Sequence, residues 1–250
     1  MKLKQINTHK RDENLFFDEK PHIYYIKGSC VGVTSVTTFI HQFFPKFETE
    51  KIIDKMMNSP RWYLSKYYGM KKEEIIQLWE DNKNLAAHKG TIMHKDIESY
   101  WNDKEFHNNT KEFNYFLNFV KDHKDLKPYR SEWEVYDEEL LLAGSIDMIF
   151  EDDDGELIIY DWKRSKDIKE TNPWEEGLYP LSHIPHANYW HYSLQLNIYK
   201  AILEKNYGKK VKEMNLLWLH PKNEKYVKLK VSDFSEEVGK MFDERKKEFE

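Results

Sequence analysis

Cysteine is almost absent from the sequence: Cys30 is the only one among 250 residues. A single thiol cannot form an intrachain disulfide, and it cannot build a zinc site or an iron–sulfur cluster that uses four cysteines. The sequence also lacks any apolar run of membrane-spanning length, and residues 1–17 lack the apolar stretch of a secretory signal. We therefore expect an intracellular protein, cytoplasmic or in the nucleoid or nucleus, that does not cross a membrane.

An excess of basic residues is missing as well. The formal net charge is −5, from 39 Lys and Arg against 44 Asp and Glu, which argues against passive coating of nucleic acid. A local basic groove is still compatible with this balance, because phosphate contacts depend on where lysines and arginines cluster. Hydrophobic residues make up 40% of the chain and charged residues 33%, enough for a sizeable core in one large or two small domains.

Two short apolar runs, residues 145–150 and 157–160, flank an acidic turn that ends in glycine. Such a turn between two apolar runs predicts a β-hairpin. Asp147 lies in the first predicted strand, and Asp161 and Lys163 close the second on one common face, which Asp147 can reach from its neighbouring strand. Two carboxylates and an ammonium that converge at a strand end predict a divalent-cation site with a proton-handling group beside it.

This set of side chains has two interpretations. In the first, carboxylate-bound Mg²⁺ supplies a nucleophilic water and charge compensation for phosphodiester hydrolysis. Lys163 then orients or deprotonates the water, or stabilises the developing charge. In the second, Asp161 and Lys163 form an ordinary strand-end ion pair, worth about 0–1 kcal/mol if it is exposed.

The first third of the chain predicts an irregular arm and a small hairpin of residues 22–28 and 30–36. Thr34 or Ser35 can cap a helix that begins at residue 36 and ends before Pro45. Amphipathic patterns predict three further helices, over residues 48–58, 61–68 and 71–81. We interpret residues 1–83 as an N-terminal arm, a small hairpin and a helical cap.

The remainder, residues 84–250, predicts one continuous unit in the order helix, three strands, helix and strand, with a final strand and helix. These elements are predicted over residues 84–101 and 112–121 (helices), 129–136, 140–150 and 156–162 (strands), 187–207 (helix), 213–220 and 226–231 (strands) and from 233 (helix). A sheet with helices on both sides is the economical way to pack this order. The connection 166–187, which contains three prolines, is longer than ordinary loops and is therefore a candidate functional segment.

Two helical patterns add polar side chains to this candidate site. His94 and Glu98 are one turn apart on the predicted helix 84–101, so Glu98 can orient a ligating His94 or bind water beside it. Gln195 and Tyr199 have the same spacing on the predicted helix 187–207. Taken alone, either pair is more often an ordinary core or surface pair than part of a site.

Together, the motifs GTIMHKDIE (90–98), GSID (144–147), DWKRS (161–165) and QLNIY (195–199) resemble the PD-(D/E)XK nuclease superfamily. The resemblance is to its RecB-like branch, which adds the helical histidine and the Q-x-x-x-Y motif, and it covers roughly residues 84–220. A looser likeness in residues 33–40 and in the run before the Gln–Tyr helix extends to exonucleases of phages and large DNA viruses and to mitochondrial genome-maintenance exonucleases.

The resemblance implies an α/β fold: a restriction-endonuclease-like core of order αβββαβ, with a mixed central sheet flanked by helices, here with the N-terminal helical cap. It makes Lys163 the catalytic lysine, acting with Asp147 and Asp161, and it makes Gln195 and Tyr199 braces of the site or contacts to the nucleic-acid backbone. The implied metal ligands are His94, Asp147, Asp161 and the Trp162 carbonyl. The position before Asp147 is Ile146 rather than the nominal proline of the family.

Residues around these motifs are further candidates. Glu132 and Glu134 on the first predicted strand are either acids of the outer shell of the site or, more commonly for such a pattern, surface residues. A basic cluster can contact phosphates or be a solvated loop start: Lys163, Arg164, Lys166 and Lys169. Four aromatic residues near the long connection can stack on unpaired bases or fill the core: Trp174, Tyr179, Tyr189 and Trp190.

We therefore predict a Mg²⁺- or Mn²⁺-dependent deoxyribonuclease, an exonuclease that acts on DNA with single-stranded ends in DNA repair or recombination. The exonuclease assignment rests on the resemblance and on the helical cap and long connection, which bracket the core in sequence. The alternatives are an RNA endonuclease with the same core and a nucleic-acid-binding or recombination protein that does not cleave. Nothing in the sequence identifies a helicase or recombinase partner.

Overall fold

The computed structural model describes residues 2–249, and its contacts divide the chain into two compact units. Unit 1 contains the chain up to Pro45 and from Met93 onward, and unit 2 is Lys46–Ile92. Residues 2–45 thus belong to the larger unit, whereas the sequence predicts that they group with the helical cap. The predicted domain boundary after residue 83 stays a prediction.

Unit 1 is built around a mixed six-stranded sheet in which β3, β5, β6, β7 and β8 are neighbours in that order and β4 pairs with β5. The strands are β3 (Thr34–Ser35), β4 (Lys127–Asp137), β5 (Leu142–Glu151), β6 (Leu157–Lys163), β7 (Val211–Trp218) and β8 (Val227–Lys230). The β3–β5 and β6–β7 pairs are parallel and the others are antiparallel. The predicted three-strand meander is confirmed, since β4, β5 and β6 are consecutive antiparallel neighbours.

One edge of β5 is shared between two strands. β4 covers the other edge along its length, whereas β3 pairs only with Leu142 and Ala143 and β6 pairs only from Met148 to Glu151. Within residues 2–249, residues 144–147 therefore have no strand beside them on that edge. The GSID motif occupies this gap in the sheet. Its residues can therefore contact side chains from helices instead of a neighbouring strand.

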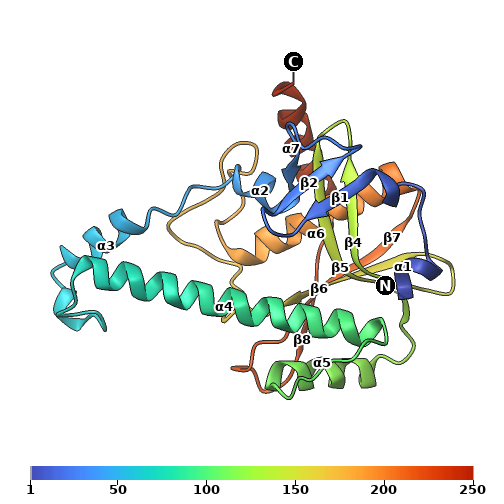
Figure 1. The fold of residues 1–250 in the computed structure, drawn as a ribbon. Coiled ribbons are helices and arrows are strands. Elements are labelled where there is room, and N and C mark those ends of the chain that lie inside the picture. Colours follow the sequence, from blue (N-terminus) through green and yellow to red (C-terminus); the bar gives the residue numbers. More distant parts are fainter. Residues whose placement is uncertain (1, 250) are drawn as a thin grey trace. The chain divides into compact units, whose positions relative to one another are not determined.

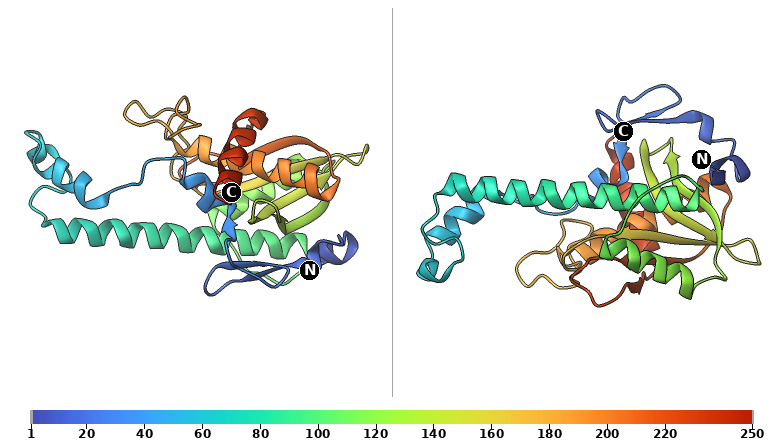
Figure 2. Two further views of the ribbon diagram at one scale, coloured as in Figure 1. Left: turned by 90° about the horizontal axis from the view of Figure 1, so that it is seen from above. Right: turned by 60° about the horizontal axis from the view of Figure 1, so that its bottom comes forward.

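Helices cover both faces of the sheet (Figures 1 and 2). On one face the core includes α2 (Val36–His41), α6 (Asn188–Tyr207) and α7 (Ser235–Lys247). On the other face it includes α1 (Lys2–Ile6), α5 (Lys111–Asp122) and the end of α4 (Lys72–Trp101) that belongs to unit 1. The expected α/β core with a mixed central sheet flanked by helices is therefore confirmed.

The N-terminal stretch of unit 1 is fastened to the sheet by buried polar contacts. Asp12 accepts hydrogen bonds from Arg130 Nη1 and from Trp133 Nε1, both at 2.9 Å. Arg245 of α7 is buried, and its Nη2 donates to the carbonyl of Gly32 at 2.9 Å. These contacts join segments that lie more than one hundred residues apart in the chain.

Two predictions about the N-terminal elements need correction. The predicted hairpin of residues 22–28 and 30–36 does not form: β2 (Ile23–Ile26) pairs instead with β1 (Leu15–Asp18), from the stretch interpreted as an irregular arm. Residues Thr34 and Ser35 join β5 in the large sheet. The predicted cap of the next helix is confirmed, because the Ser35 side chain accepts a hydrogen bond from Thr38 N.

Unit 2 contains α3 (Thr49–Met57), a short 3₁₀ turn (Trp62–Leu64) and the first part of α4. The predicted helix over 61–68 is limited to that turn, because the hydroxyl of Ser65 accepts from Tyr67 N and competes with helical hydrogen bonding.

The predicted break between residues 81 and 84 is absent. The side chain of Asn82 donates to Leu78 O at 2.7 Å, a bond within the same helix, so α4 continues without interruption. Residues 2–249 contain no helix that combines the length and the apolar character needed to cross a membrane.

Candidate active site

Asp147 and Asp161 lie where β5 and β6 separate. The backbone pairing of the two strands ends at Met148 and Tyr160. One residue beyond this last pair, the Asp147 side chain takes over, because its Oδ2 accepts a hydrogen bond of 2.7 Å from the backbone N–H of Trp162. The divergence of the strands thus aims the Asp147 carboxylate at the end of β6, as the hairpin pattern predicts.

His94 approaches the same point from α4. Its Nε2 lies 2.8 Å from the Trp162 carbonyl oxygen, which can only accept, so Nε2 carries the proton of the neutral ring. The lone pair of Nδ1 then faces the acids: Nδ1 lies 3.5 Å from Asp147 Oδ2 and 4.0 Å from Glu132 Oε1. A backbone carbonyl that fixes the tautomer of a histidine in this way is typical of metal-binding histidines.

Glu132 is the residue whose role the sequence analysis leaves open. It lies in β4 between Ser131 and Trp133, which pair with Met148 and Ile146 on either side of Asp147, and it has a φ of 44°, in the left-handed region that is rare for a non-glycine residue in a strand. Its Oε2 accepts a hydrogen bond of 3.0 Å from Ser145 Oγ. Burial and the neighbouring charge of Asp147 raise the pKa of Glu132 well above its ordinary value. Backbone strain of this kind concentrates at functional sites.

Three side chains therefore form a candidate metal centre: one ligand atom each from His94, Glu132 and Asp147 lie within 4.8 Å of one another. An imidazole nitrogen and two carboxylates are a donor set that suits Mn²⁺ and Mg²⁺. The residues thus fit a divalent cation. Asp161 lies outside this group of three, and the Trp162 carbonyl accepts from His94; their predicted roles as ligands stay predictions.

Lys163 lies between an acid, an amide and a ring. Its Nζ is 2.6 Å from Asp161 Oδ2, 3.4 Å from Gln195 Oε1 and 4.5 Å from the centre of the Tyr192 ring. Burial lowers the pKa of Lys163, but the carboxylates of Asp161 and Asp147 outweigh burial and hold it above its ordinary value. The side chain is therefore a fixed ammonium rather than a free base.

Asp161 is almost fully buried, with an exposed fraction of 2%. Burial raises the pKa of Asp161 to about 6, against the opposing effect of Lys163. The Asp161–Lys163 contact is consequently not the exposed strand-end pair of the alternative interpretation. Each of the two charges stabilises the other in a site from which water is largely excluded, so removing one would leave the other buried without a partner.

Gln195 and Tyr199 continue this chain of contacts along α6. Gln195 Nε2 donates to Tyr199 Oη at 3.3 Å, and the Tyr199 ring is buried. Tyr199 in turn packs against Gly144 in the gap of β5, where an added Cβ would lie 2.6 Å from Tyr199 Oη. These contacts place Gln195 and Tyr199 where they can hold Lys163 in position. The buried Tyr199 ring does not reach the solvent.

The structure does not bring all predicted residues to the site. Glu98 contacts Lys104 at 3.3 Å and makes no hydrogen bond to His94 within residues 2–249. Arg164 Nε lies 2.6 Å from Glu112 Oε1 in a pair whose side chains are only 11% and 9% exposed, so its charge is already used inside the protein. Lys166 is exposed, and its predicted contact to substrate stays a prediction.

A cavity of about 270 Å³ lies beside Lys163, between α2 and α6. Its wall includes Lys163, Gln195, Asn188, His41 and His191. Neither histidine is predicted from the sequence, because each stands alone on its helix without a second polar residue in a recognisable pattern. Tyr192 was missed as well, although it stands one turn before Gln195 on the same helix, a spacing that places both on one face.

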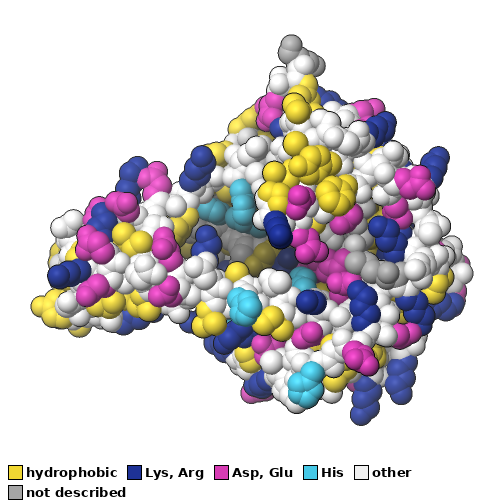
Figure 3. Space-filling view, in the orientation of Figure 1, with side chains coloured by type: hydrophobic (Ala, Val, Ile, Leu, Met, Phe, Trp, Pro, Cys, Tyr) yellow, Lys and Arg dark blue, Asp and Glu magenta, His cyan; other side chains and the backbone are white. Residues whose placement is uncertain are grey.

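The aromatic residues of the long connection fall into two groups. Tyr189 and Trp190 pack against the hydrophobic core, whereas Trp174 and Tyr179 are 88% and 74% exposed. Figure 3 shows that charges of both signs and histidines are interspersed on one face of the molecule, with acidic side chains gathered near the middle of the picture. On this face, a basic surface for nucleic acid would have to be local.

Comparison with known proteins gives one family. The model of the PD-(D/E)XK nuclease superfamily matches residues 63–250. No curated protein matches the sequence. Among solved structures, the crystal structure of SSO0001 is similar over 98% of this chain and 81% of that chain, at 14% identity and a TM-score of 0.37, values too low for a conclusion about fold or function.

Proposed function

Because the chain belongs to the PD-(D/E)XK nuclease superfamily, we propose that it is a metal-dependent deoxyribonuclease that removes nucleotides from DNA with single-stranded ends. Membership of this superfamily indicates a nuclease, hence a nucleic-acid substrate and a divalent metal. The finer terms belong to the proposal: DNA rather than RNA, ends rather than internal bonds, membership of the RecB-like branch, and a role in repair or recombination.

The observation that carries the proposal is the meeting of five polar side chains at the point where β5 and β6 separate. His94, Glu132 and Asp147 form the candidate metal centre. Asp161 and Lys163 stand beside it, 2.6 Å apart and held on the other side by Gln195. Three acids brought together in a half-buried position repel one another unless protons or a cation compensate their charge, and a bound divalent cation would supply that compensation.

We assign the metal to His94, Glu132 and Asp147, with Asp161 completing the acidic surroundings. Mg²⁺ or Mn²⁺ bound there would polarise a phosphoryl oxygen and lower the pKa of a bound water. The protein itself contributes the orientation of the ligands: the backbone carbonyl of Trp162 accepts from His94 Nε2, and the backbone N–H of Trp162 donates to Asp147 Oδ2. The backbone of one residue thus fixes two of the three proposed ligands.

Lys163 is proposed as the stabiliser of negative charge. Its ammonium group is held by Asp161 and the Tyr192 ring, both of which favour the protonated form. A positioned cation assists phosphodiester hydrolysis where charge develops on the phosphoryl oxygens. Of the roles that the sequence analysis leaves open for Lys163, the contacts support charge stabilisation over removal of a proton from water.

The preference for ends is supported by the resemblance and by the connection 166–187, which begins three residues after Lys163. A single strand that enters from a free end can follow this segment into the site. The central experiment compares end-labelled linear single-stranded DNA with a closed single-stranded circle of equal composition, in Mg²⁺ and in Mn²⁺. Duplex DNA and RNA are the parallel substrates.

We expect release of mononucleotides or short products from linear DNA, little cleavage of circles, and a loss of at least 100-fold in the Lys163→Ala variant. Equal rates on circles and linear strands would replace the exonuclease with an endonuclease. Faster cleavage of RNA than of DNA would favour the RNA endonuclease. Activity of Lys163→Ala within threefold of the unaltered protein would remove the nuclease assignment from this site.

A further inference from the structure

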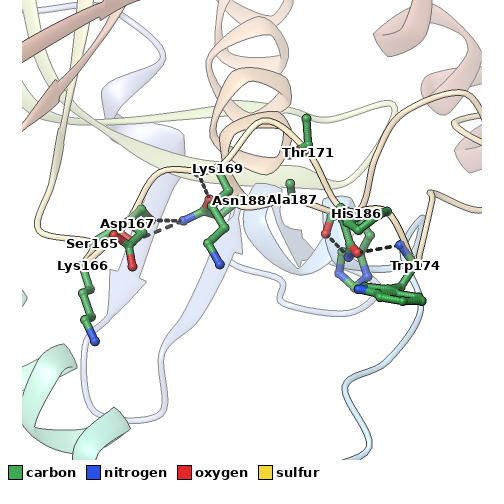
Figure 4. Close-up of a pocket in the computed structure, with 11 residues that line it drawn as sticks. Ser165, Lys166, Asp167, Lys169, Thr171, Trp174, His186, Ala187 and Asn188 are labelled. Carbon is green, nitrogen blue, oxygen red and sulfur yellow. Dashed lines mark hydrogen bonds between the residues drawn. The ribbon is translucent and has the colours of Figure 1, made fainter.

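A second pocket lies directly beyond the catalytic strand. It has a volume of about 560 Å³ and is formed by the first part of the connection 166–187 and the N-terminus of α6 (Figure 4). Figure 4 shows Ser165, Lys166 and Asp167 toward one end of the pocket and His186 and Trp174 toward the other. We propose that this pocket binds one nucleotide of a single strand, next to the bond that is cleaved; the inference rests on the proposed function.

The pocket is a built site rather than a loose loop, because Asn188 ties its wall together. Asn188 Nδ2 donates to the Asp167 carbonyl at 2.8 Å and to Ser165 Oγ at 3.2 Å, while its Oδ1 accepts from Lys169 N at 2.8 Å. The far side is held by Asn172, whose Nδ2 donates to the His186 carbonyl at 2.8 Å. A wall that is ordered before binding reduces the entropy cost of holding a flexible strand.

The charge of the pocket suits a phosphate. Lys166 and Lys169 are exposed and line it, and within residues 2–249 neither has a carboxylate at ion-pair distance. The one acid in the wall, Asp167, is already paired with Lys222 at 2.8 Å. Two uncompensated ammonium groups therefore remain for the phosphodiester backbone, in a protein whose net charge is −5.

Trp174 supplies the surface for a base. Its side chain is 88% exposed although it is large and apolar, and its backbone N–H is fixed by a hydrogen bond of 3.1 Å to Asn172 Oδ1. Exposed aromatic faces beside basic groups are the usual platform for unpaired bases, which every base can use because each has a π-face. In duplex DNA these faces are stacked on neighbouring bases, so the platform selects single strands.

The pocket also shares a wall with the cavity beside Lys163. Asn188 lines both this pocket and the cavity beside Lys163. His186 of this pocket stacks on His191 of the other, with ring centres 5.2 Å apart. A strand that leaves Lys163 along this shared wall reaches Lys166 and Lys169 with its phosphates and Trp174 with its next base.

The experiment measures binding without cleavage. Fluorescence anisotropy of a labelled twelve-nucleotide oligothymidylate is recorded with the Lys163→Ala protein, over a range of salt concentrations. Adding Trp174→Ala should weaken binding on the order of 10-fold, whereas Trp174→Phe, which keeps a stacking face, should stay within about threefold. Phe16→Ala, which removes an aromatic side chain that is 62% exposed on β1, is the matched control and should change nothing.

The lysines are tested through the salt dependence. Replacing Lys166 and Lys169 with Gln should make the negative slope of log K against log salt shallower by about 1.4, since each phosphate contact to a single strand contributes about −0.7. The same double replacement at the exposed Lys121 and Lys124 is the control. Binding of duplex DNA should respond to the lysine pair and not to Trp174→Ala.

An unchanged affinity of the Trp174→Ala protein, or an equal loss for duplex and single strand, would overturn the inference, and an unchanged salt slope in the lysine double variant would do the same. These results differ from failure of the proposed function. Loss of the nuclease assignment appears as absence of cleavage by the unaltered protein, while the effects of Trp174 and the two lysines on binding remain measurable.

Discussion

Glu132 adds a third acidic side chain to a site that two aspartates and a histidine already define. Its left-handed φ and its buried carboxyl both cost free energy in the folded protein. A cation bound between Glu132, Asp147 and His94 would offset the repulsion between the two acids. The residue is therefore expected to matter for metal binding and to be unfavourable for the stability of the metal-free protein.

Replacing Glu132 with Gln should weaken Mn²⁺ binding on the order of 10-fold or more, because the number of charged ligands sets the affinity of such sites. The metal-free variant should unfold at the same temperature as the unaltered protein or at a higher one. Isothermal titration with Mn²⁺ and thermal unfolding in chelator measure the two effects. Glu134→Gln on the same strand is the matched control, and a variant at Glu132 that binds Mn²⁺ normally would exclude it as a ligand.

At the scale of single residues, the site residues that can be predicted from the sequence are those whose positions depend on local geometry. Asp161 and Lys163 share a face because strands alternate, and Asp147 follows from the hairpin. The position of Glu132 could not be predicted in the same way. Its orientation depends on its own left-handed backbone conformation inside β4, and no local pattern predicts this conformation. The contact of Arg164 with Glu112 joins the end of β6 to α5, and such long-range pairs also leave no local signal.

At the scale of elements, the gap in β5 lets α6 approach the sheet. Gly144 has no side chain, so Tyr199 can lie against the β5 backbone and hold Gln195 toward Lys163. A methyl group at position 144 would overlap Tyr199 Oη and push the ring away. The spacing of α6 from the sheet thus depends on one glycine.

Gly144→Ala should lower the free energy of unfolding by about 1–3 kcal/mol, as overpacking of a buried contact does. Cleavage should fall as well, because the displaced Tyr199 no longer supports Gln195 beside Lys163. Chemical denaturation and the linear-DNA assay measure the two changes. Gly239→Ala in α7, where nothing lies within 4 Å of the added Cβ, should instead be neutral or slightly stabilising; equal behaviour of the two variants would contradict the packing account.

The elements themselves follow from the sequence to different degrees. β5 and β6 follow from apolar runs on either side of an acidic turn, and α6 follows from its length and from Gly208 at its end, although its buried residues are spread around the helix. The hairpin of residues 22–28 was paired with the wrong partner, because pairing is decided by contacts outside the two strands. The two helices predicted over residues 71–81 and 84–101 form one continuous helix, in which the side chain of Asn82 bonds to a carbonyl of the same helix.

At the scale of the whole molecule, three histidines on α2, α6 and the connection before it form one cluster beside the cavity. His191 stacks on His186 at 5.2 Å and lies 5.6 Å from His41, and Glu175 Oε2 is 3.3 Å from His186 Nδ1. Burial, with the neighbouring His186 and His41, lowers the pKa of His191 to about 4, and burial lowers the pKa of His41 as well. The folded state therefore favours the neutral form of both rings.

A histidine whose folded pKa lies below its unfolded value of about 6.5 stabilises the protein fully only above that pH. The free energy of unfolding should therefore fall as the pH decreases from about 6.5 toward 4, by roughly 1–2 kcal/mol for His191, since partial exposure of the ring reduces the effect. His191→Phe should flatten this part of the stability curve, measured by denaturation at several pH values. The same replacement at exposed His88 is the control, and parallel curves for His191→Phe and the unaltered protein would refute the prediction.

Unit 1 is assembled from two stretches of chain that unit 2 separates. The earlier stretch supplies β3 to the edge of β5 and Asp12 to Arg130 and Trp133. Cutting the chain inside unit 2 would leave two fragments, each with only part of the sheet, that can rebuild unit 1 by associating. All five side chains of the candidate active site lie on the later fragment, whereas His41 and its wall of the cavity lie on the earlier one. Activity of the later fragment should therefore rise and then level off as the earlier fragment is added, because the two associate into unit 1.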